Sequence, residues 1–422
     1  MNKFLIINPF GIGDVLFTTP VIRAIKDRHP DSFIGYWSNE RVGELLISNP
    51  KIDRVFALSR GDIKRIYKNS SLKRLTALFK LINDIRKERF DVAFDFSLDS
   101  RYGLWSKLAG IKKRIGLDYK NRGRFLTDKV KLAGYSGKHV VEYYLDLLNF
   151  TDPHCRAHFG SASLTIPQTI PSLSRESLGY KLEVSDEVSA RAKKILAEHG
   201  IMAADLFIGV APGGGASWGK DATYKQWPAE RFAELADRLT KDLNAKVVLL
   251  GSADEKPIAE IVLGKIVLSC PRKRASINDA PLDSRWSLPR AWIPAFAGMT
   301  RGGNDNEPNQ AIAPTMVNLT GRLSLKELTA IISELKLLIC NDGGPLHMAV
   351  ALGVKTVSIF GPVDERVYGP YPPGAKHIVV KKDLPCRPCY KDFRFTGCSN
   401  NRKCLGDISV DEVHEKVKSL MS

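Results

Sequence analysis

The sequence predicts an α/β protein with two domains that face each other across a cleft, each built from a parallel sheet with helices on both faces. Strand and helix signals alternate along the N-terminal half. The turn Gly11-Ile12-Gly13-Asp14 follows the apolar strand Phe4 to Ile7, and the turn Asn341 to His347 follows the apolar run Leu335 to Cys340. Glycines between a strand and a helix bring backbone N–H groups to an anionic ligand. Two such turns, about 330 residues apart, indicate one phosphate-binding turn per domain.

Length and composition are those of a globular protein with two or three domains. The chain has 422 residues, of which 44% are hydrophobic and 26% charged. No apolar run approaches the roughly 18 residues that span a bilayer, and Met1 to Lys3 lead into a strand without the cleavage site of a signal peptide. We therefore expect a cytoplasmic protein.

The net charge of +17 is concentrated in one segment, because Arg60 to Lys138 holds 21 Lys and Arg residues but only 8 Asp and Glu residues. Such a basic surface attracts phosphate-rich partners: nucleic acid, anionic lipid headgroups or a phosphorylated glycolipid. A solvated pair of basic helices accounts for the charge equally well.

The N-terminal domain is expected to span residues 1–180, with an irregular linker at 151–177 that is rich in Pro, Ser and Thr. Its predicted elements are strands at Phe4 to Asn8, Phe33 to Trp37 and Val92 to Phe96, and helices at Gly13 to Asp27, restarting at Pro20, and at Leu72 to Ile85. The apolar side of the last helix is Leu72, Leu75, Leu78, Phe79, Ile82 and Ile85. Packing of this side on the sheet is favoured over contact with a membrane surface.

The C-terminal domain is expected at residues 181–408, followed by a C-terminal helix at 409–422. Its predicted elements are strands at Phe207 to Val210, Lys246 to Leu250, Val317 to Leu319 and Leu337 to Cys340, and helices at Pro228 to Asp242, Leu325 to Leu335 and Leu346 to Leu352. Ser324 with Glu327, and Ser409 with Glu412, fit capping boxes and predict two helix starts.

Residues 269–310 carry Pro, Arg, Trp and Gly without helical or strand periodicity. A structureless loop of this length is uncommon inside a compact domain. The segment resembles the translation of a dispersed repeat element of bacterial genomes. It is therefore predicted to be an inserted, disordered segment without a functional role for Trp286 or Trp292.

A third glycine-rich segment, Pro212 to Ser217, precedes a helix, with Lys220 and Lys225 between them. Glycine permits close approach of backbone to phosphate, and lysine adds a mobile positive charge. The segment is no Walker A loop, because Gly-x-x-x-x-Gly-Lys-Ser/Thr is absent.

Together the motifs resemble glycosyltransferase family 9, the lipopolysaccharide heptosyltransferases. The resemblance rests on Gly11 to Asp14 with Thr18 to Pro20, Ala211 to Ser217 with Lys225 to Pro228, Asn318 to Gly321, Asn341 to His347, and Phe360 to Pro362. It implies the GT-B architecture of two Rossmann-like domains, with acceptor bound mainly by the first and nucleotide sugar by the second. It also implies inverting transfer of a heptose from ADP-heptose to the phosphorylated inner core of a lipid-anchored acceptor, at the inner face of the cytoplasmic membrane.

The family pattern assigns candidate roles to individual residues. It implies Asp14 as the base that deprotonates the acceptor hydroxyl, although Asp is also a common helix N-cap. Lys225 matches the phosphate-binding lysine, against a solvent-exposed lysine as the alternative. The implied donor-binding residues are Gly214, Gly215, Ser217, Glu255, Asp342, Gly343, Gly344 and His347. Acidic residues such as Glu255 bind ribose hydroxyls in this fold type, while His347 could alternatively cap a helix. The implied acceptor-binding residues are Gly13, Arg101, Arg122 and Arg124.

No cofactor is expected, and no obligatory metal, because an Asp-x-Asp pair near the donor loop is absent. Four of the seven cysteines form the pattern Cys386-x2-Cys389-x8-Cys398-x5-Cys404. A structural zinc and free thiols are equally consistent with this spacing.

Three other classes of protein were compared with these motifs. A nicotinamide dehydrogenase needs Gly-x-Gly-x-x-Gly, and Leu16 occupies the place of the third glycine. A nucleic-acid-binding protein suits the charge but shows no known binding module. A catalytically inactive nucleotide-sugar-binding protein, or a family member with another donor or acceptor, is the alternative to the heptosyltransferase.

The insertion hypothesis predicts that a short Gly/Ser linker can replace residues 269–310. Loop-closure entropy changes by only about 0.6 kcal/mol per doubling of loop length, so we expect the folding and activity of the chain to be preserved. Circular dichroism and an activity assay on the deletion variant measure this. Unfolding of that variant, or burial of Trp286 and Trp292 in the domain, would contradict the hypothesis.

Overall fold

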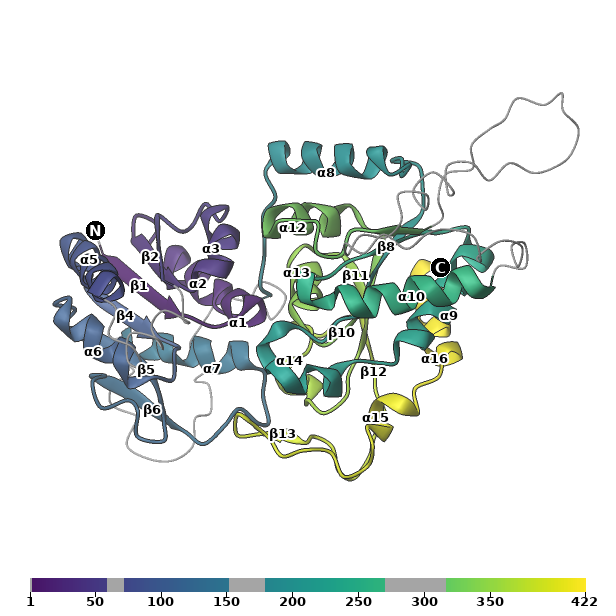
Figure 1. Cartoon of the computed structure of the whole chain (residues 1–422). Coiled ribbons are helices and arrows are strands. Elements are labelled where there is room, and N and C mark those ends of the chain that lie inside the picture. The colour runs from purple at the N-terminus through teal and green to yellow at the C-terminus, as the bar shows by residue number, and fades with distance from the viewer. Residues whose placement is uncertain (1, 59–71, 152–178, 270–315) are drawn as a thin grey trace, which may run out of the picture.

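The protein consists of two α/β lobes side by side, joined near α1, α7 and α13 (Figure 1). The computed structural model describes residues 2–58, 72–151, 179–269 and 316–422. Only the first residue of the predicted linker at 151–177 and the first residue of the predicted insertion at 269–310 lie within these residues. Each lobe contains one six-stranded sheet covered by helices, which confirms the predicted fold class.

The N-terminal lobe contains β1 (Lys3–Asn8), α1 (Ile12–Leu16), α2 (Thr19–Arg28), β2 (Phe33–Ser38), α3 (Glu40–Ile47), β3 (Arg54–Ala57), α5 (Leu72–Glu88), β4 (Val92–Asp95), α6 (Ser100–Leu108), β5 (Lys113–Tyr119), β6 (Asp128–Leu132), α7 (Val140–Asp146) and the 3-10 helix η1 (Leu147–Thr151). The predicted helix that restarts at Pro20 is thus two helices, α1 and α2, with Pro20 in the first turn of the second.

The C-terminal lobe contains α8 (Asp186–Glu198), β7 (Phe207–Ala211), η3 (Ala216–Lys225), α9 (Ala229–Leu243), β8 (Lys246–Leu249), η4 (Ala253–Glu255), α10 (Lys256–Ser269), β9 (Met316–Asn318), α12 (Leu325–Glu334), β10 (Leu337–Asn341), α13 (Gly344–Ala351), β11 (Lys355–Ile359), α14 (Glu365–Tyr368), β12 (His377–Val380), the hairpin strands β13 (Tyr390–Lys391) and β14 (Arg394–Phe395), α15 (Lys403–Gly406) and α16 (Val410–Met421). The capping boxes at Ser324 and Ser409 are both formed.

Both large sheets have the same strand order. The first runs β3-β2-β1-β4-β5-β6 and the second β9-β8-β7-β10-β11-β12, and every neighbouring pair in both is parallel. This is the Rossmann order 3-2-1-4-5-6, in which the chain reverses direction across the sheet between its two central strands. The loops that follow β1, β4, β7 and β10 therefore leave the sheets at the two reversal points.

The central strand β1 is buried on both faces, because helices cover both sides of its sheet. Leu5 and Ile7 belong to one hydrophobic cluster with residues of α5 and α6. Phe4 and Ile6 belong to a second cluster on the opposite face. This second cluster continues without interruption into the C-terminal lobe.

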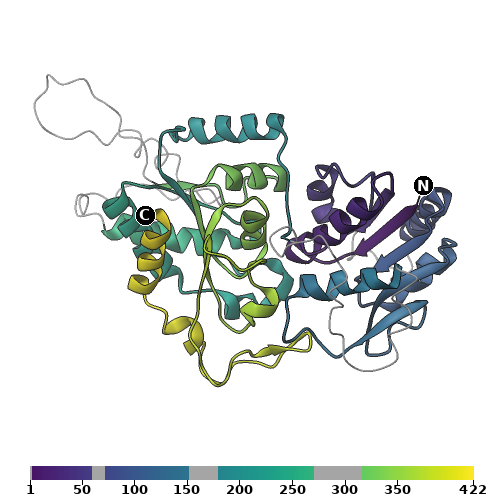
Figure 2. The ribbon, with the colours of Figure 1, turned by 180° about the vertical axis from the view of Figure 1, so that it is seen from behind.

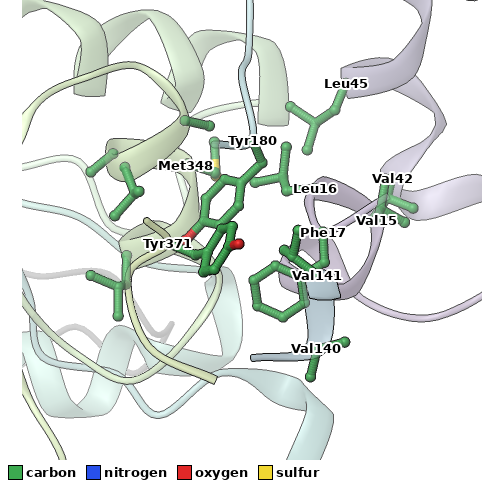
Figure 3. Close-up of a cluster of buried hydrophobic side chains, with 14 of the residues drawn as sticks. Val15, Leu16, Phe17, Val42, Leu45, Val140, Val141, Tyr180, Met348 and Tyr371 are labelled. Atoms are coloured by element: carbon green, nitrogen blue, oxygen red, sulfur yellow. The ribbon is translucent and has the colours of Figure 1, made fainter. Parts of the chain in front are cut away.

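Residues from both lobes meet in this shared cluster (Figure 3). The ring of Phe17, between α1 and α2, lies 5.4 Å from the ring of Tyr180 in the segment that connects the lobes. Val141 of α7 lies on the same side as Phe17, and Met348 of α13 and Tyr371 face them. Apolar packing therefore fixes α1 against the C-terminal lobe.

Helix α5 follows its predicted packing in part. Leu78, Ile82 and Ile85 are buried against their own sheet, as favoured. Phe79 was assigned to the same apolar side, but this is wrong, because its side chain is 60% exposed. It lies one position beyond the buried stripe. None of the described helices is both long and apolar enough to cross a membrane.

Candidate active site

Asn8, at the end of β1, shapes the first glycine-rich turn. Its amide Nδ2 donates a hydrogen bond to the carbonyl oxygen of Asp14 (2.9 Å), and its Oδ1 accepts one from the N–H of Phe10 (3.1 Å). These two bonds fold the loop after Asn8 into α1, whose N-cap is Gly11. Asp14 lies three positions after this cap, so the structure excludes it as the N-cap of α1.

The C-terminal lobe uses the same device at the end of β10. Asn341 Nδ2 donates to the carbonyl oxygens of Pro212 (2.8 Å) and Gly213 (3.1 Å), and its Oδ1 accepts from the N–H of Trp227 (3.0 Å). One buried side chain thereby holds both ends of the segment that contains Lys225. The loops after β7 and β10 are locked together beside the second reversal point.

Lys225 and Asp342 form a buried ion pair at this point. Lys225 Nζ lies 2.7 Å from Asp342 Oδ2, and both side chains are 7% exposed. Nζ also lies 5.2 Å from the centre of the Trp218 ring, a cation–π distance. The alternative of a solvent-exposed lysine is therefore excluded. Desolvation offsets much of the attraction in such a pair, so stability alone does not explain its presence.

His347 stands beside this pair, inside α13. Its Nε2 lies 4.0 Å from Asp342 Oδ1, and its Nδ1 is hydrogen-bonded to the Tyr180 hydroxyl (3.1 Å). Burial lowers the pKa of His347 to about 4, while the charge of Asp342 raises it and that of Lys225 lowers it. The imidazole is therefore neutral near pH 7, so its contact with Asp342 is no ion pair. His347 is the fourth residue of α13, so the alternative that it caps a helix is excluded.

The His347 ring packs directly on the first glycine-rich turn. A Cβ atom on Gly13 would lie 2.6 Å from His347 Cδ2. A Cβ atom on Gly344 would similarly lie 3.1 Å from Cδ1 of Ile12. Glycine at these two positions lets α1 approach α13, which brings the predicted base and the predicted nucleotide loop into one site.

Asp14 and Asp342 face the same group of side chains from opposite lobes. Burial raises the pKa of Tyr390 to about 12, and the charges of both carboxylates add to the rise. Burial also raises the pKa of Tyr368, with smaller contributions from the same two carboxylates. The two acidic groups therefore lie at the boundary between the lobes, within electrostatic reach of the same phenols.

Glu255 contacts the third glycine-rich segment. Its Oε1 accepts from the N–H of Gly215 (3.0 Å), while its Oε2 accepts from the N–H (2.8 Å) and Oγ (3.0 Å) of Ser252. A Cβ atom on Gly213 would lie only 1.8 Å from Oε1. Gly214 is buried in the same loop. The side chain of the predicted donor residue Ser217 lies outside the described part of the chain.

The predicted acceptor arginines occupy two places in the N-terminal lobe. Arg101, in α6 after β4, donates two hydrogen bonds of 3.0 Å through Nε to the carboxylate of Asp99. Although burial acts in the opposite direction, these contacts and the nearby charge of Arg122 hold the pKa of Asp99 below its usual value. Arg122 and Arg124 are exposed on the turn between β5 and β6.

The four clustered cysteines flank the β13–β14 hairpin. Cys386 and Cys389 precede it, and Cys398 and Cys404 follow it. None of the four is in a disulfide. Within the described ranges, no three His, Cys, Asp or Glu side chains are arranged to hold a metal ion, so the geometry gives no support to the zinc alternative.

Sequence reasoning missed the aromatic members of the site. Tyr180 contacts His347 from a segment 167 residues away in the chain, whereas Trp218 contacts Lys225 within the same segment, η3. A tryptophan seven residues before the predicted phosphate-binding lysine was the available signal for the second. A small crevice beside the connecting segment, lined by residues such as Leu182 and Lys326, contains none of the candidate residues.

The chain matches one known protein family over most of its length. The family described as glycosyltransferase family 9 (heptosyltransferase) matches residues 78–278 and 300–398. Residues 279–299, which the match leaves out, lie inside the predicted insertion. Lipopolysaccharide heptosyltransferase 2 of Salmonella typhimurium is 24% identical over 420 residues, covering 100% of this chain and 99% of that protein. Lipooligosaccharide heptosyltransferase 2 of Campylobacter jejuni is 25% identical over 421 residues, covering 99% and 98%.

Two solved structures have the same fold. The E. coli ADP-heptose lps heptosyltransferase II superposes with a TM-score of 0.66 at 21% identity, covering 99% of this chain and 98% of that chain. A glycosyl transferase family 9 protein of Veillonella parvula gives a TM-score of 0.70 at 21% identity, covering 100% and 97%. Both superpositions extend over both lobes.

The close packing at Gly13 predicts a specific sensitivity. Gly13→Ala places a methyl group against the His347 ring, and overpacking of this kind costs about 1–3 kcal/mol. We expect a loss of stability of that size in urea unfolding followed by circular dichroism. Gly264→Ala is the matched control, because Gly264 also lies inside a helix and a Cβ atom there meets nothing within 4 Å. Equal stability of the two variants would show that the ring does not fill this space.

Proposed function

Because the chain belongs to glycosyltransferase family 9, we propose that it transfers a heptose from ADP-heptose to the inner core of lipopolysaccharide, with inversion at the anomeric carbon. One observation carries the proposal. The helix with Asp14 packs on the helix that follows Asp342, because Gly13 and Gly344 permit close contact. A proton acceptor and a phosphate-binding loop thus share one interlobe site. The names of the relatives support the choice of heptose and of lipopolysaccharide.

The C-terminal lobe would bind the donor. The N–H groups at the start of α13 point toward a ligand placed after β10, where the helix dipole favours negative charge. Lys225 would contact the diphosphate oxygens and stabilise the charge that grows on them as the bond to the sugar breaks. The diphosphate would then compete with Asp342 for Nζ. His347, being neutral, would donate a hydrogen bond without adding a positive charge.

The N-terminal lobe would supply the base. As the acceptor hydroxyl attacks the anomeric carbon, its proton passes to the Asp14 carboxylate, and the nucleoside diphosphate leaves on the opposite face of the sugar. This displacement inverts the configuration of that carbon. Lys225 and the backbone N–H groups provide the positive charge at the leaving group, so the proposed mechanism needs no metal ion.

The acceptor would approach from the edge of the first sheet. Arg122 and Arg124 are exposed there and carry the positive charge that a phosphorylated sugar requires. Arg101 would act more weakly, because Asp99 already binds its guanidinium. On this proposal, the exposed basic residues between positions 76 and 138 face the inner surface of the cytoplasmic membrane, where a lipid-anchored acceptor resides.

A binding assay and a product analysis test the proposal directly. Saturation with ADP at 100 times its dissociation constant adds roughly 2.7 kcal/mol of stability, which thermal unfolding detects. Incubation with ADP-heptose and a heptose-deficient core acceptor should then give a product with inverted anomeric configuration by NMR. Binding without product would support the inactive-binder alternative, and selective binding of another nucleotide would replace the donor.

Asp14→Asn tests the base. The amide keeps the shape of the side chain but accepts no proton, so we expect kcat to fall by about 10²-fold or more while ADP affinity stays unchanged. Single-turnover transfer and calorimetry measure the two quantities. Asp27→Asn, an exposed carboxylate on the neighbouring helix α2, is the control. Near-normal turnover of Asp14→Asn would remove this residue as the base.

Lys225→Ala tests the contact with the diphosphate. We expect kcat to fall by about 10²- to 10³-fold together with weaker donor binding, since the lost charge acts on the leaving group. Lys220→Ala, an exposed lysine in the same segment, should have little effect.

Removal of Lys225 also leaves Asp342 buried without its cation, so stability needs a separate check. Lys225→Arg, which keeps the charge, should retain the fold and part of the donor affinity. A change confined to acceptor affinity in Lys225→Ala would contradict the assignment of donor binding to the C-terminal lobe.

A further inference from the structure

A short hairpin of the C-terminal lobe crosses to the N-terminal lobe. We call residues 390–395, formed by β13, a two-residue turn and β14, the interlobe hairpin. Its strands pair Tyr390 with Phe395 and Lys391 with Arg394. Figures 1 and 2 show it leaving the C-terminal lobe and reaching the N-terminal lobe near β6. The transfer mechanism assigns no role to it.

The tip of the hairpin docks in an aromatic site on the N-terminal lobe. The ring of Phe393 lies edge-on to Tyr119 (4.8 Å between ring centres) and to Tyr135 (4.9 Å). The Tyr119 hydroxyl donates a hydrogen bond to the carbonyl oxygen of Asp392 (3.1 Å). Gly134 admits the tip, since a Cβ atom there would lie 2.3 Å from Asp392 Oδ1.

The backbone of the tip is strained. Asp392 and Phe393 have φ values of 51° and 61°, as a two-residue hairpin turn with two left-handed residues requires. Such turns favour Asn, Asp and Gly, whereas a bulky side chain at positive φ is an outlier. Strain of this kind persists where the surroundings determine the conformation. The contacts of the Phe393 ring provide such surroundings.

The base of the hairpin supports the predicted phosphate-binding lysine. The rings of Tyr390 and Phe395 each lie 5.1 Å from the ring of Trp218. Phe395 also contacts Tyr224 at 4.8 Å. Trp218 and Tyr224 are part of η3, the segment that ends at Lys225, and the Trp218 ring lies below Lys225 Nζ at 5.2 Å. The hairpin therefore contacts the N-terminal lobe through Phe393 at its tip and contacts Trp218 through the aromatic rings at its base. Trp218 in turn contacts Lys225.

We propose that the interlobe hairpin positions Lys225, and that Phe393 is a positioning residue that makes the placement of this lysine depend on docking of the N-terminal lobe. The base orients η3 through Trp218, and the tip holds the base in place. Because coupling is reciprocal, a ligand on Lys225 should also stabilise the docked tip. The inference rests on the proposed function for the choice of ADP as the probe and for the turnover assay, while the hydrogen-exchange test needs neither.

Hydrogen exchange tests the coupling without any ligand. In Phe393→Ala the tip loses its ring, and we expect amide exchange in residues 216–226 to become at least fivefold faster than in the wild type. Asp392→Gly is the matched control: it relaxes the turn at the neighbouring position and keeps both the ring and the carbonyl that binds Tyr119. Unchanged exchange of residues 216–226 in Phe393→Ala, in a folded protein, would overturn the proposal.

Ligand binding and turnover give a second readout. We expect Phe393→Ala to weaken ADP binding and lower kcat, each by about tenfold, with Phe393→Tyr restoring both because it keeps the ring. A purely structural role predicts lower thermal stability with wild-type kcat and ADP affinity per folded molecule, and that result would also overturn the proposal. Failure of the wild type to bind ADP would count against the proposed donor alone, because the exchange experiment needs no nucleotide.

Discussion

The contact between the His347 ring and Gly13 determines how the two lobes meet. A ring fits there only because Gly13 has no side chain, and the ring stays neutral because burial lowers the pKa of His347 to about 4. Protonation would place a second buried positive charge next to Lys225, whose ion-pair partner Asp342 already lies beside the ring. Neutral packing therefore keeps α1 on α13, and with it Asp14 close to the predicted nucleotide loop.

Two copies of one sheet topology explain why the candidate residues converge. Each reversal point lies between two central strands of a sheet. At each point an asparagine side chain donates a hydrogen bond to a loop carbonyl: Asn8 to Asp14 in the first sheet, and Asn341 to Pro212 in the second. The glycine-rich turns therefore marked the correct strands from sequence alone. Among the elements that were not predicted are the strands β3, β5, β6, β11 and β12 and the helices α3, α6, α7, α8 and α10. In β6, exposed Lys129 and Lys131 alternate with Val130 and Leu132, which is a strand pattern that the sequence contained.

The motifs gave the positions of the candidate residues in the chain but not all of their contacts. Asp14, Lys225, Asp342 and His347 were assigned from motifs, and the structure brings the last three into contact. Some of the contacts that were missed are local: Asp99 caps α6 beside Arg101, and Ser252 with Glu255 forms a capping box of the same pattern as Ser324 with Glu327. The hydrogen bond from the N–H of Gly215 to Glu255 joins residues 40 positions apart, so it depends on the tertiary fold.

The buried pair of Lys225 and Asp342 links stability to the proposed chemistry. A buried ion pair is weak evidence for stability, because removal of two charges from water offsets their attraction. The two members of the pair have different neighbours: Lys225 also faces the Trp218 ring, and Asp342 also faces His347. A diphosphate that takes the lysine would leave Asp342 beside a neutral imidazole. In the empty site, Asp342 would hold the Lys225 side chain in position through the ion pair. When the donor binds, the interlobe hairpin would fix the position of Lys225 through Trp218.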